Sequence, residues 1–379
     1  MFENCKDLIN TIISTLKQKL VSNNSVFVGI ASQNNYNVID FGCETINCIK
    51  RKYKDSDEAD KTKIGFVFFN ETFYIMFCTA VFRAIKRKYT DSYLIVFVNN
   101  DICYDILKSN SDVDELVLCT DDYIQNLKKD SFHVFYNFND IKQFIVNNRQ
   151  NKNIFQILSE YFDFNVDASD QNILCKSNKI LDFLLNKKKY VTIQVSLDEE
   201  VKGNVKSILY SKFEKLVNYI HVKYGIEVFQ ISFSNDIKLF GTVDLMDLDI
   251  FYTAHVIKNA LCHIGPVSIF THIARSLNVP SIVLFGPVPV SFCGYENNIN
   301  LCSNTHICKC CWFEDERWEK CKDSSVKICL NEISLNQLQA AVDKFLSKKV
   351  FLPYEYKKSD FVSDVNGEEI VVVADGSDE

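Results

Sequence analysis

The chain has 379 residues, 47% of them hydrophobic, so its length predicts two to three domains with a sizeable buried core. Its formal net charge of −7 argues against a general nucleic-acid-binding protein, because such proteins usually present a basic face. The 15 cysteines follow a start without a signal-peptide pattern, which favours reduced thiols in the cytoplasm. No apolar run approaches the roughly 18 to 20 residues of a membrane span.

The first 60 residues have patterns typical of a helix, of short strands and of a charged linker. Residues 4–22 have the apolar spacing of a helix, and residues 25–31 and 36–42 look like short strands around an Asn-rich turn. A charged stretch, residues 50–63, then looks like a linker. We therefore expect residues 1–60 to form an accessory N-terminal region.

A regular strand and helix alternation begins at residue 63. Apolar strands are predicted at 64–69, 93–98, 114–119 and 133–138, with a helix over 72–89 and helical segments between the others. Apolar strands that alternate with helices predict a parallel sheet covered on both faces. Residues 63–186 are therefore expected to form an N-terminal Rossmann-like lobe, ending in helical material and a basic linker.

The same alternation restarts at residue 190. Strands are predicted at 190–196, 226–233, 260–265 and 281–286, and helices at 204–224, 244–259 and 267–278. Residues 187–350 are thus expected to form a second Rossmann-like lobe that faces the first across a cleft, followed by an acidic tail over 351–379. Ligands of such sheets bind beyond the carboxyl ends of the strands, so this cleft is the expected site.

Two strand ends of the second lobe carry Gly-Pro pairs, at Gly265-Pro266 and Gly286-Pro287. The predicted helix that starts near Ser268 presents free amides at its beginning, which suit a diphosphate. Gly286 would let the backbone approach a ligand closely. The alternative is an ordinary tight turn between strand and helix.

This stretch resembles glycosyltransferase family 9, the ADP-heptose:lipopolysaccharide heptosyltransferases and their relatives. The matching residues are Ile264-Gly265, Ser268, His272-Ile273-Ala274, Leu277, Pro280 and Leu284-Phe285-Gly286-Pro287. The resemblance covers residues 63–347 in order and implies the α/β GT-B architecture. It further implies inverting transfer of a heptose-like sugar from a nucleotide-diphospho-sugar to a glycan or protein hydroxyl, without a catalytic metal. The N-terminal lobe would bind the acceptor and the C-terminal lobe the donor.

The resemblance also implies donor-binding residues. Lys206, with Lys202 as its substitute, matches the family's phosphate-binding lysine, and Asp247 lies where the family has an acid near the nucleotide. His272 matches a family histidine, and Gly265, Ser268 and Gly286 border the phosphate turn. A surface lysine, an exposed helical acid and a buried histidine are the structural alternatives.

Several chemistry-bearing positions depart from the family. Phe73 and Tyr74 stand where the family has Gly-Asp, so Glu71 is the nearest candidate for the catalytic base. Apolar residues also replace the family's polar or glycine residues at positions 267, 269 and 288. The pattern fits a relative with a changed substrate, and it equally fits a catalytically inactive partner or scaffold subunit.

Five cysteines lie between Cys308 and Cys329. Cys308, Cys311, Cys321 and Cys329 have the spacing of a tetrahedral zinc or iron site, with Cys302, His306 and Cys310 as rivals and disulfides or free thiols as alternatives. Residues 302–330 resemble the iron-binding cysteine finger of the family's autotransporter heptosyltransferases, which form larger rings, so a structural metal and a homo- or hetero-oligomer are expected. Cysteines in apolar context, such as Cys78 and Cys262, are expected to be buried.

Overall fold

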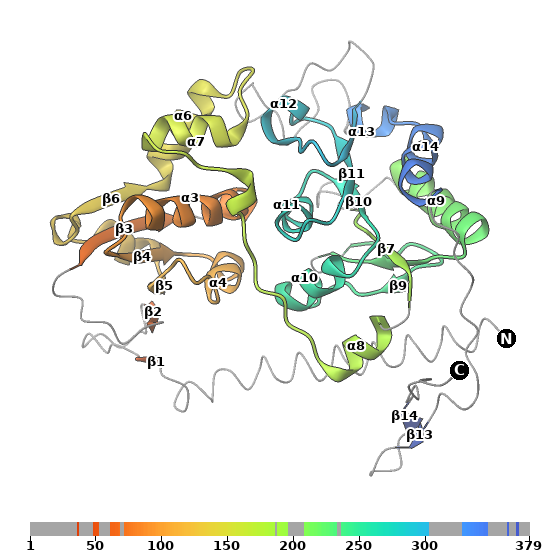
Figure 1. The fold of residues 1–379 in the computed structure, drawn as a ribbon, viewed down its shortest axis with the longest axis horizontal. Helices are drawn as coiled ribbons and strands as arrows, with labels where there is room; N and C mark the ends of the chain where they lie inside the picture. Colours follow the sequence, from red (N-terminus) through yellow and green to blue (C-terminus); the bar gives the residue numbers. More distant parts are fainter. Residues whose placement is uncertain are drawn as a thin grey trace.

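The protein consists of two α/β lobes that lie side by side (Figure 1). The computed structural model describes residues 36–37, 48–52, 61–68, 72–185, 188–195, 208–232, 236–302, 328–347, 362–363 and 369–370. The predicted α/β class with two Rossmann-like lobes is confirmed. Among the described helices, none is both long and apolar enough to cross a membrane.

The first lobe is built on a six-stranded sheet in the order β1-β2-β5-β4-β3-β6. The strands are β1 (Tyr36–Asn37), β2 (Cys48–Lys52), β3 (Thr62–Phe68), β4 (Ser92–Val98), β5 (Glu115–Cys119) and β6 (Val134–Asn137). The strands β3 to β6 are parallel, whereas β2 runs antiparallel to β5. Every residue of β4 is buried, as its continuous apolar sequence predicted.

The strand β2 corrects part of the sequence prediction. Residues 50–52 were expected to begin a charged linker, but they pair with β5. Cross-strand hydrogen bonding to a buried neighbour outweighs their unfavourable β-propensity, which is strongly context-dependent. Whether residues 1–60 form a separate accessory region stays a prediction.

Helices cover both faces of the first sheet and follow its strands in alternation. They are η1 (Thr72–Tyr74), α3 (Ile75–Lys88), α4 (Asp101–Leu107), α5 (Asp121–Gln125), η2 (Lys129–Ser131), α6 (Phe138–Asn148), α7 (Ile154–Phe162) and η3 (Ala168–Asp170). Helix α8 (Lys179–Leu185) follows the connecting segment and lies beside the second lobe, where its Asp182 pairs with His255. Helix α3 is the central one, with ten buried residues.

The second lobe has a six-stranded sheet in the order β12-β11-β10-β7-β8-β9, in which all pairs are parallel. Its strands are β7 (Tyr190–Ile193), β8 (Glu227–Gln230), β9 (Val243–Asp244), β10 (His263–Pro266), β11 (Ser281–Phe285) and β12 (Ile299–Cys302). Its helices are α9 (Ile208–Tyr224), α10 (Ile250–Lys258), α11 (Ile269–Ser276), α12 (Val290–Cys293), α13 (Ile328–Glu332) and α14 (Leu335–Leu346). In the acidic tail, β13 (Val362–Ser363) pairs with β14 (Glu369–Ile370).

Helix α10 starts later than predicted. The sequence suggested a helix from residue 244, but β9 occupies residues 243–244 and Asp247 has a φ of 64°. That left-handed conformation cannot continue a right-handed helix. Asp249 then caps α10 by accepting a hydrogen bond from the amide of Phe251, so the helix begins at Ile250.

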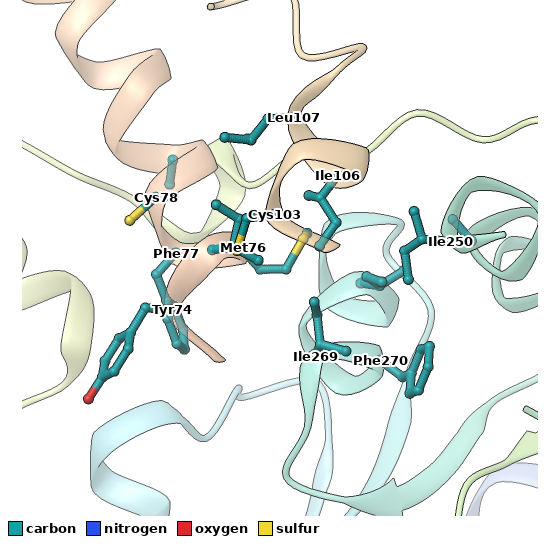
Figure 2. Close-up of a cluster of buried hydrophobic side chains, with 14 of the residues drawn as sticks. Tyr74, Met76, Phe77, Cys78, Cys103, Ile106, Leu107, Ile250, Ile269 and Phe270 are labelled. Atoms are coloured by element: carbon teal, nitrogen blue, oxygen red, sulfur yellow. The ribbon is translucent and has the colours of Figure 1, made fainter. Parts of the chain in front are cut away.

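The two lobes share one hydrophobic core. Helices α9 and α14 cover one face of the second sheet and enclose a separate core with it. The opposite face is covered by α10 and α11, which pack on α4 and α3 of the first lobe. Figure 2 shows where they meet, with Met76 and Ile106 on one side and Ile250, Ile269 and Phe270 on the other.

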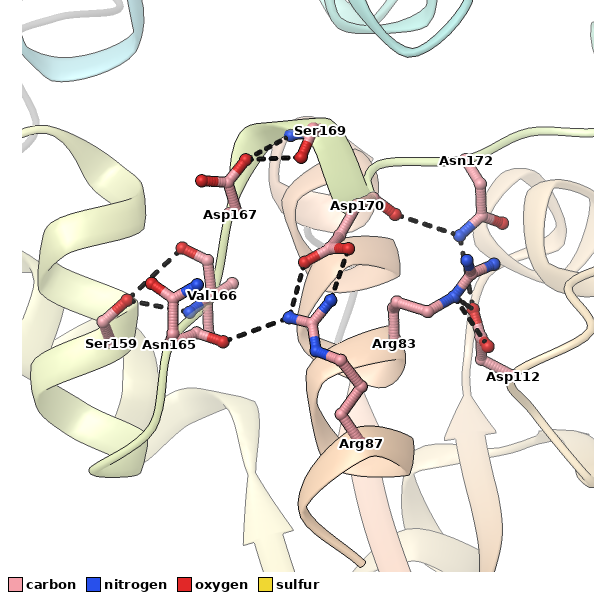
Figure 3. Close-up of polar contacts among 10 residues, drawn as sticks. All are labelled: Arg83, Arg87, Asp112, Ser159, Asn165, Val166, Asp167, Ser169, Asp170 and Asn172. Atoms are coloured by element: carbon pink, nitrogen blue, oxygen red, sulfur yellow. Dashed lines mark hydrogen bonds and ion pairs between the residues drawn. The ribbon is translucent and has the colours of Figure 1, made fainter. Parts of the chain in front are cut away.

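The connection between the lobes is fastened to helix α3 by polar contacts (Figure 3). Arg87 makes a two-pronged ion pair with Asp170, with both N–O distances at 2.6 Å. The side-chain amide of Asn172 donates to Asp112, which also accepts from Arg83. These contacts hold the chain in place as it leaves the first lobe.

Candidate functional site

Three of the predicted donor-binding residues, Gly265, Ser268 and Gly286, lie at the carboxyl ends of β10 and β11, beside the end of β7. Gly265 pairs with Val283, and Gln194, just beyond β7, donates its amide hydrogen to the carbonyl of Ile264. Ser268 lies between the end of β10 and the start of α11. Strands, turn and helix start thus occupy the edge where parallel sheets bind ligands.

Helix α11 begins without a side-chain cap. Ser268 occupies the N-cap position, but its hydroxyl donates to Oε1 of Gln194 at 2.5 Å. In contrast, α10 and α14 are capped by Asp249 and Ser334. Since amides at a helix start carry partial positive charge, the start of α11 is suited to an anion.

Two glycines allow close packing around this helix start. A Cβ on Gly265 would lie 3.2 Å from Cβ of Gln194 and 3.3 Å from Nε2 of His263. A Cβ on Gly286 would lie 2.8 Å from Cγ of Leu330. The close approach that Gly286 permits in the structure is therefore to α13, and its predicted role beside a ligand stays a prediction.

The apolar replacements lie at the boundary between the lobes. Ile269 and Val288 are only 7% and 8% exposed and belong to the shared core. Val267 packs on that core but is half-buried, as are Ser268 and Gly286. The partly exposed rim of the site is thus made by Val267, Ser268 and Gly286, while Ile269 and Val288 are turned inward.

His272 lies deep between the lobes. Its Nδ1 lies 2.8 Å from the hydroxyl of Tyr295, which donates to Gln171 of the connecting segment. The ring centroids of Phe77 and Phe73 lie 4.4 and 5.5 Å from the centroid of the imidazole. Burial lowers the pKa of His272 to about 3, so the ring is neutral at physiological pH.

Comparison with known proteins supports this architecture. No family model matches the sequence, and neither does any curated protein. Among solved structures, the glycosyl transferase family 9 protein from Veillonella parvula DSM 2008 aligns with a TM-score of 0.55 and 10% identity, over 78% of this chain and 100% of that one. The chain has the fold of glycosyltransferase family 9. TibC, an iron-containing dodecameric glycosyltransferase from enterotoxigenic E. coli H10407, aligns with a TM-score of 0.56 and 12% identity, over 76% of this chain and 77% of that one.

The family 9 fold confirms the resemblance at the level of architecture. The two first-lobe residues that depart from the family pattern, Phe73 and Tyr74, lie in apolar surroundings in the structure. Tyr74 is 3% exposed in the core, and the ring of Phe73 packs against His272. The candidate base, Glu71, and the candidate phosphate-binding residues Lys206 and Lys202 lie outside the described residues.

Asp247 lies in the turn before α10 rather than in a helix. Its side chain is exposed, and its backbone amide donates to the carbonyl of Ser232. The alternative of a helical surface acid is therefore wrong, because the backbone is left-handed there. A role of Asp247 at the nucleotide stays a prediction.

Of the four predicted metal ligands, only Cys329 is described. It is 5% exposed at the start of α13, and its Sγ would lie 3.1 Å from a Cβ on Gly286. Cys308, Cys311 and Cys321 lie outside the described residues, within which no group of three or more metal-ligating side chains occurs. Elsewhere, Cys78 and Cys262 are buried as predicted.

Sequence reasoning missed Gln194, Gln171 and Tyr295. Gln194 and Thr192, two positions before it, are polar residues in a predicted strand that is otherwise largely apolar. Such a pattern indicates that the polar side chains have buried hydrogen-bond partners. The partner of Gln194 is 74 residues away and that of Gln171 is 124 residues away, so neither pair can be read from local sequence.

Proposed function

We propose that this protein is a glycosyltransferase that moves a sugar, with inversion, from a nucleotide-diphospho-sugar to a hydroxyl of a glycan or protein. The observation that carries the proposal is the uncapped start of α11 beside Gly265, at the carboxyl ends of three parallel strands. The family 9 fold supports it, because solved structures with this fold include glycosyltransferases.

The chemistry follows from the charge that develops in the reaction. A departing nucleoside diphosphate gains negative charge, which the amides of α11 stabilise together with Lys206. Glu71 would accept the proton of the acceptor hydroxyl, and no catalytic metal is part of the proposal. Gly265, the backbone of Ser268, His272, Gly286 and Asp247 complete the proposed donor side.

A heptose is the proposed sugar. TibC has been solved in complex with ADP-D-β-D-heptose, and that structure aligns with this chain with a TM-score of 0.53 and 12% identity. Calorimetry with ADP-heptose and with other ADP-, GDP- and UDP-sugars tests the donor. Tight binding of one nucleotide class, with release of nucleoside diphosphate when acceptor is added, supports the proposal. Absence of binding to every nucleotide and nucleotide-sugar contradicts it.

A second candidate is a catalytically inactive subunit that supports an active glycosyltransferase. It is favoured by the burial of Ile269 and Val288 in the shared core and by Tyr74 at the position of the family's acid. Turnover by the purified chain alone excludes this candidate. Stimulation of a partner enzyme by a chain that binds no donor supports it.

A structural zinc or iron ion held by Cys308, Cys311, Cys321 and Cys329 is also proposed. The buried Cys329 fits a closed site, because structural metal sites exclude water and take four protein ligands. The ion would fold the cysteine segment rather than take part in the transfer. Metal analysis of the purified protein distinguishes zinc from iron. Because TibC is dodecameric, sedimentation of the same sample tests for an oligomer.

A further inference from the structure

We propose that Gln194 is a positioning residue for the donor diphosphate. It holds the hydroxyl of Ser268 away from the first amides of α11, so that these amides remain available to the anion. The inference rests on the proposed function, because it concerns the same helix start. It adds a residue that does not touch the donor but decides whether the helix start can bind it.

Ser268 already has the backbone of a capping residue. Its φ of −158° and ψ of 175° are extended, and a serine in that conformation normally accepts a hydrogen bond from an amide two or three residues ahead. Ser334 does this for α14, accepting from the amide of Gln337 at 3.2 Å. Ser268 instead donates its hydroxyl hydrogen to Gln194. The Ser268 hydroxyl, which could cap α11, therefore bonds to Gln194 instead of to an amide of its own helix.

Gln194 is fixed before any ligand arrives. It is 4% exposed, and its amide donates to Ile264 at 2.9 Å. Its Cβ passes within 3.2 Å of the Cβ position on Gly265, a crossing that only glycine permits without displacement. A preorganised acceptor of this kind holds Ser268 without losing side-chain freedom on binding.

A second observation lies beneath the turn. His263 is fully buried; its Nδ1 lies 3.1 Å from Oγ1 of Thr192, and its Nε2 has no hydrogen-bond partner among the described residues. That Nε2 lies 3.3 Å from the Cβ position on Gly265, at the turn into α11. An unpaired buried polar atom costs stability and calls for an explanation, which a site built for binding supplies.

Loss of Gln194 should make the Ser268 hydroxyl compete with the diphosphate for the amides of α11. Without Gln194, the Ser268 hydroxyl is free to rotate and to accept from an amide of α11, as an ordinary N-cap does. The cap and the diphosphate then compete for the same donors. Removing the hydroxyl as well should end the competition, so the loss caused by the first substitution is reversed by the second.

The experiment measures binding of ADP, GDP and UDP by calorimetry and follows the tightest of them. We expect Gln194→Met, which keeps the buried volume, to weaken binding about fivefold, the strength of a typical cap. The double variant Gln194→Met with Ser268→Ala should bind more tightly than Gln194→Met alone. Ser334→Ala, which removes the cap of α14, serves as the control for a general loss of stability and should leave binding unchanged.

Each other result has a defined meaning. If the unaltered protein binds none of the three nucleotides, the proposed function fails and the inference fails with it. If it binds but Gln194→Met binds equally well, the inference alone is overturned. A double variant as weak as Gln194→Met shows that Gln194 acts through packing, which also overturns it. Gln194→Ala provides a second test if Gln194→Met does not fold.

Discussion

Acidification should destabilise the protein through two histidines of the second lobe. His263 and His272 are fully buried, and burial lowers the pKa of each to about 3. In the unfolded chain their pKa returns to about 6.5. Below that pH the unfolded chain binds more protons than the folded one. Stability is therefore complete above pH 6.5 and is lost as the pH falls towards 3.

The size of the effect follows from the two pKa values. Between the folded-state and the unfolded-state pKa, each pH unit of acidification lowers the free energy of unfolding by about 1.4 kcal/mol per histidine. Acidification from about pH 6.5 to about pH 5 should thus cost about 2 kcal/mol for each histidine and about 4 kcal/mol for both. That is a large share of the roughly 5–15 kcal/mol that stabilises a typical domain.

Urea denaturation followed by circular dichroism across this pH range measures the loss. The variant with His263→Gln and His272→Gln should show a flatter pH dependence, because glutamine keeps an amide in place without titrating. Equal slopes in the double variant and the unaltered protein would refute the reasoning.

Three further predictions concern packing, the connection between the lobes and the metal. Gly286→Ala should lower the free energy of unfolding by about 1–3 kcal/mol, because its Cβ would lie 2.8 Å from Leu330; an unchanged urea midpoint contradicts this. Arg87→Ala should cost about 0.5–1 kcal/mol through loss of the pair with Asp170, whereas Lys152→Ala, from a more exposed pair, should cost less; equal losses argue against a special role of the connection. A strong chelator should lower the thermal midpoint by unfolding the cysteine segment, and a midpoint that does not move speaks against a structural ion.

The architecture was largely predictable because its signals are local. Apolar runs such as β4 and β11 are buried along their whole length, and helices alternate with them as the pattern indicated. The resemblance around Gly265 and Ser268 located the carboxyl edge of the second sheet. The start of α10 was missed because the left-handed backbone at Asp247 is not encoded by glycine.

The polar contacts at the site were less predictable, since they depend on partners distant in sequence. A serine before a helix predicts a cap, but the hydroxyl of Ser268 donates to Gln194, which the sheet brings beside it from 74 residues away. The burial of His272 likewise results from the first lobe, whose Phe73 and Phe77 cover it. Neither outcome follows from residues near it in the chain.

The strand β2 has a consequence for handling the protein. It covers the side of β5, a strand whose residues are almost all buried, and its sequence CIKRK brings three basic residues next to the short edge strand β1. Charged residues near the edge of a sheet and very short edge strands discourage other chains from adding on, whereas an uncovered β5 would offer unpaired backbone groups to them. A shortened protein that begins at residue 61 should therefore precipitate or self-associate more readily than one that keeps residues 48–52.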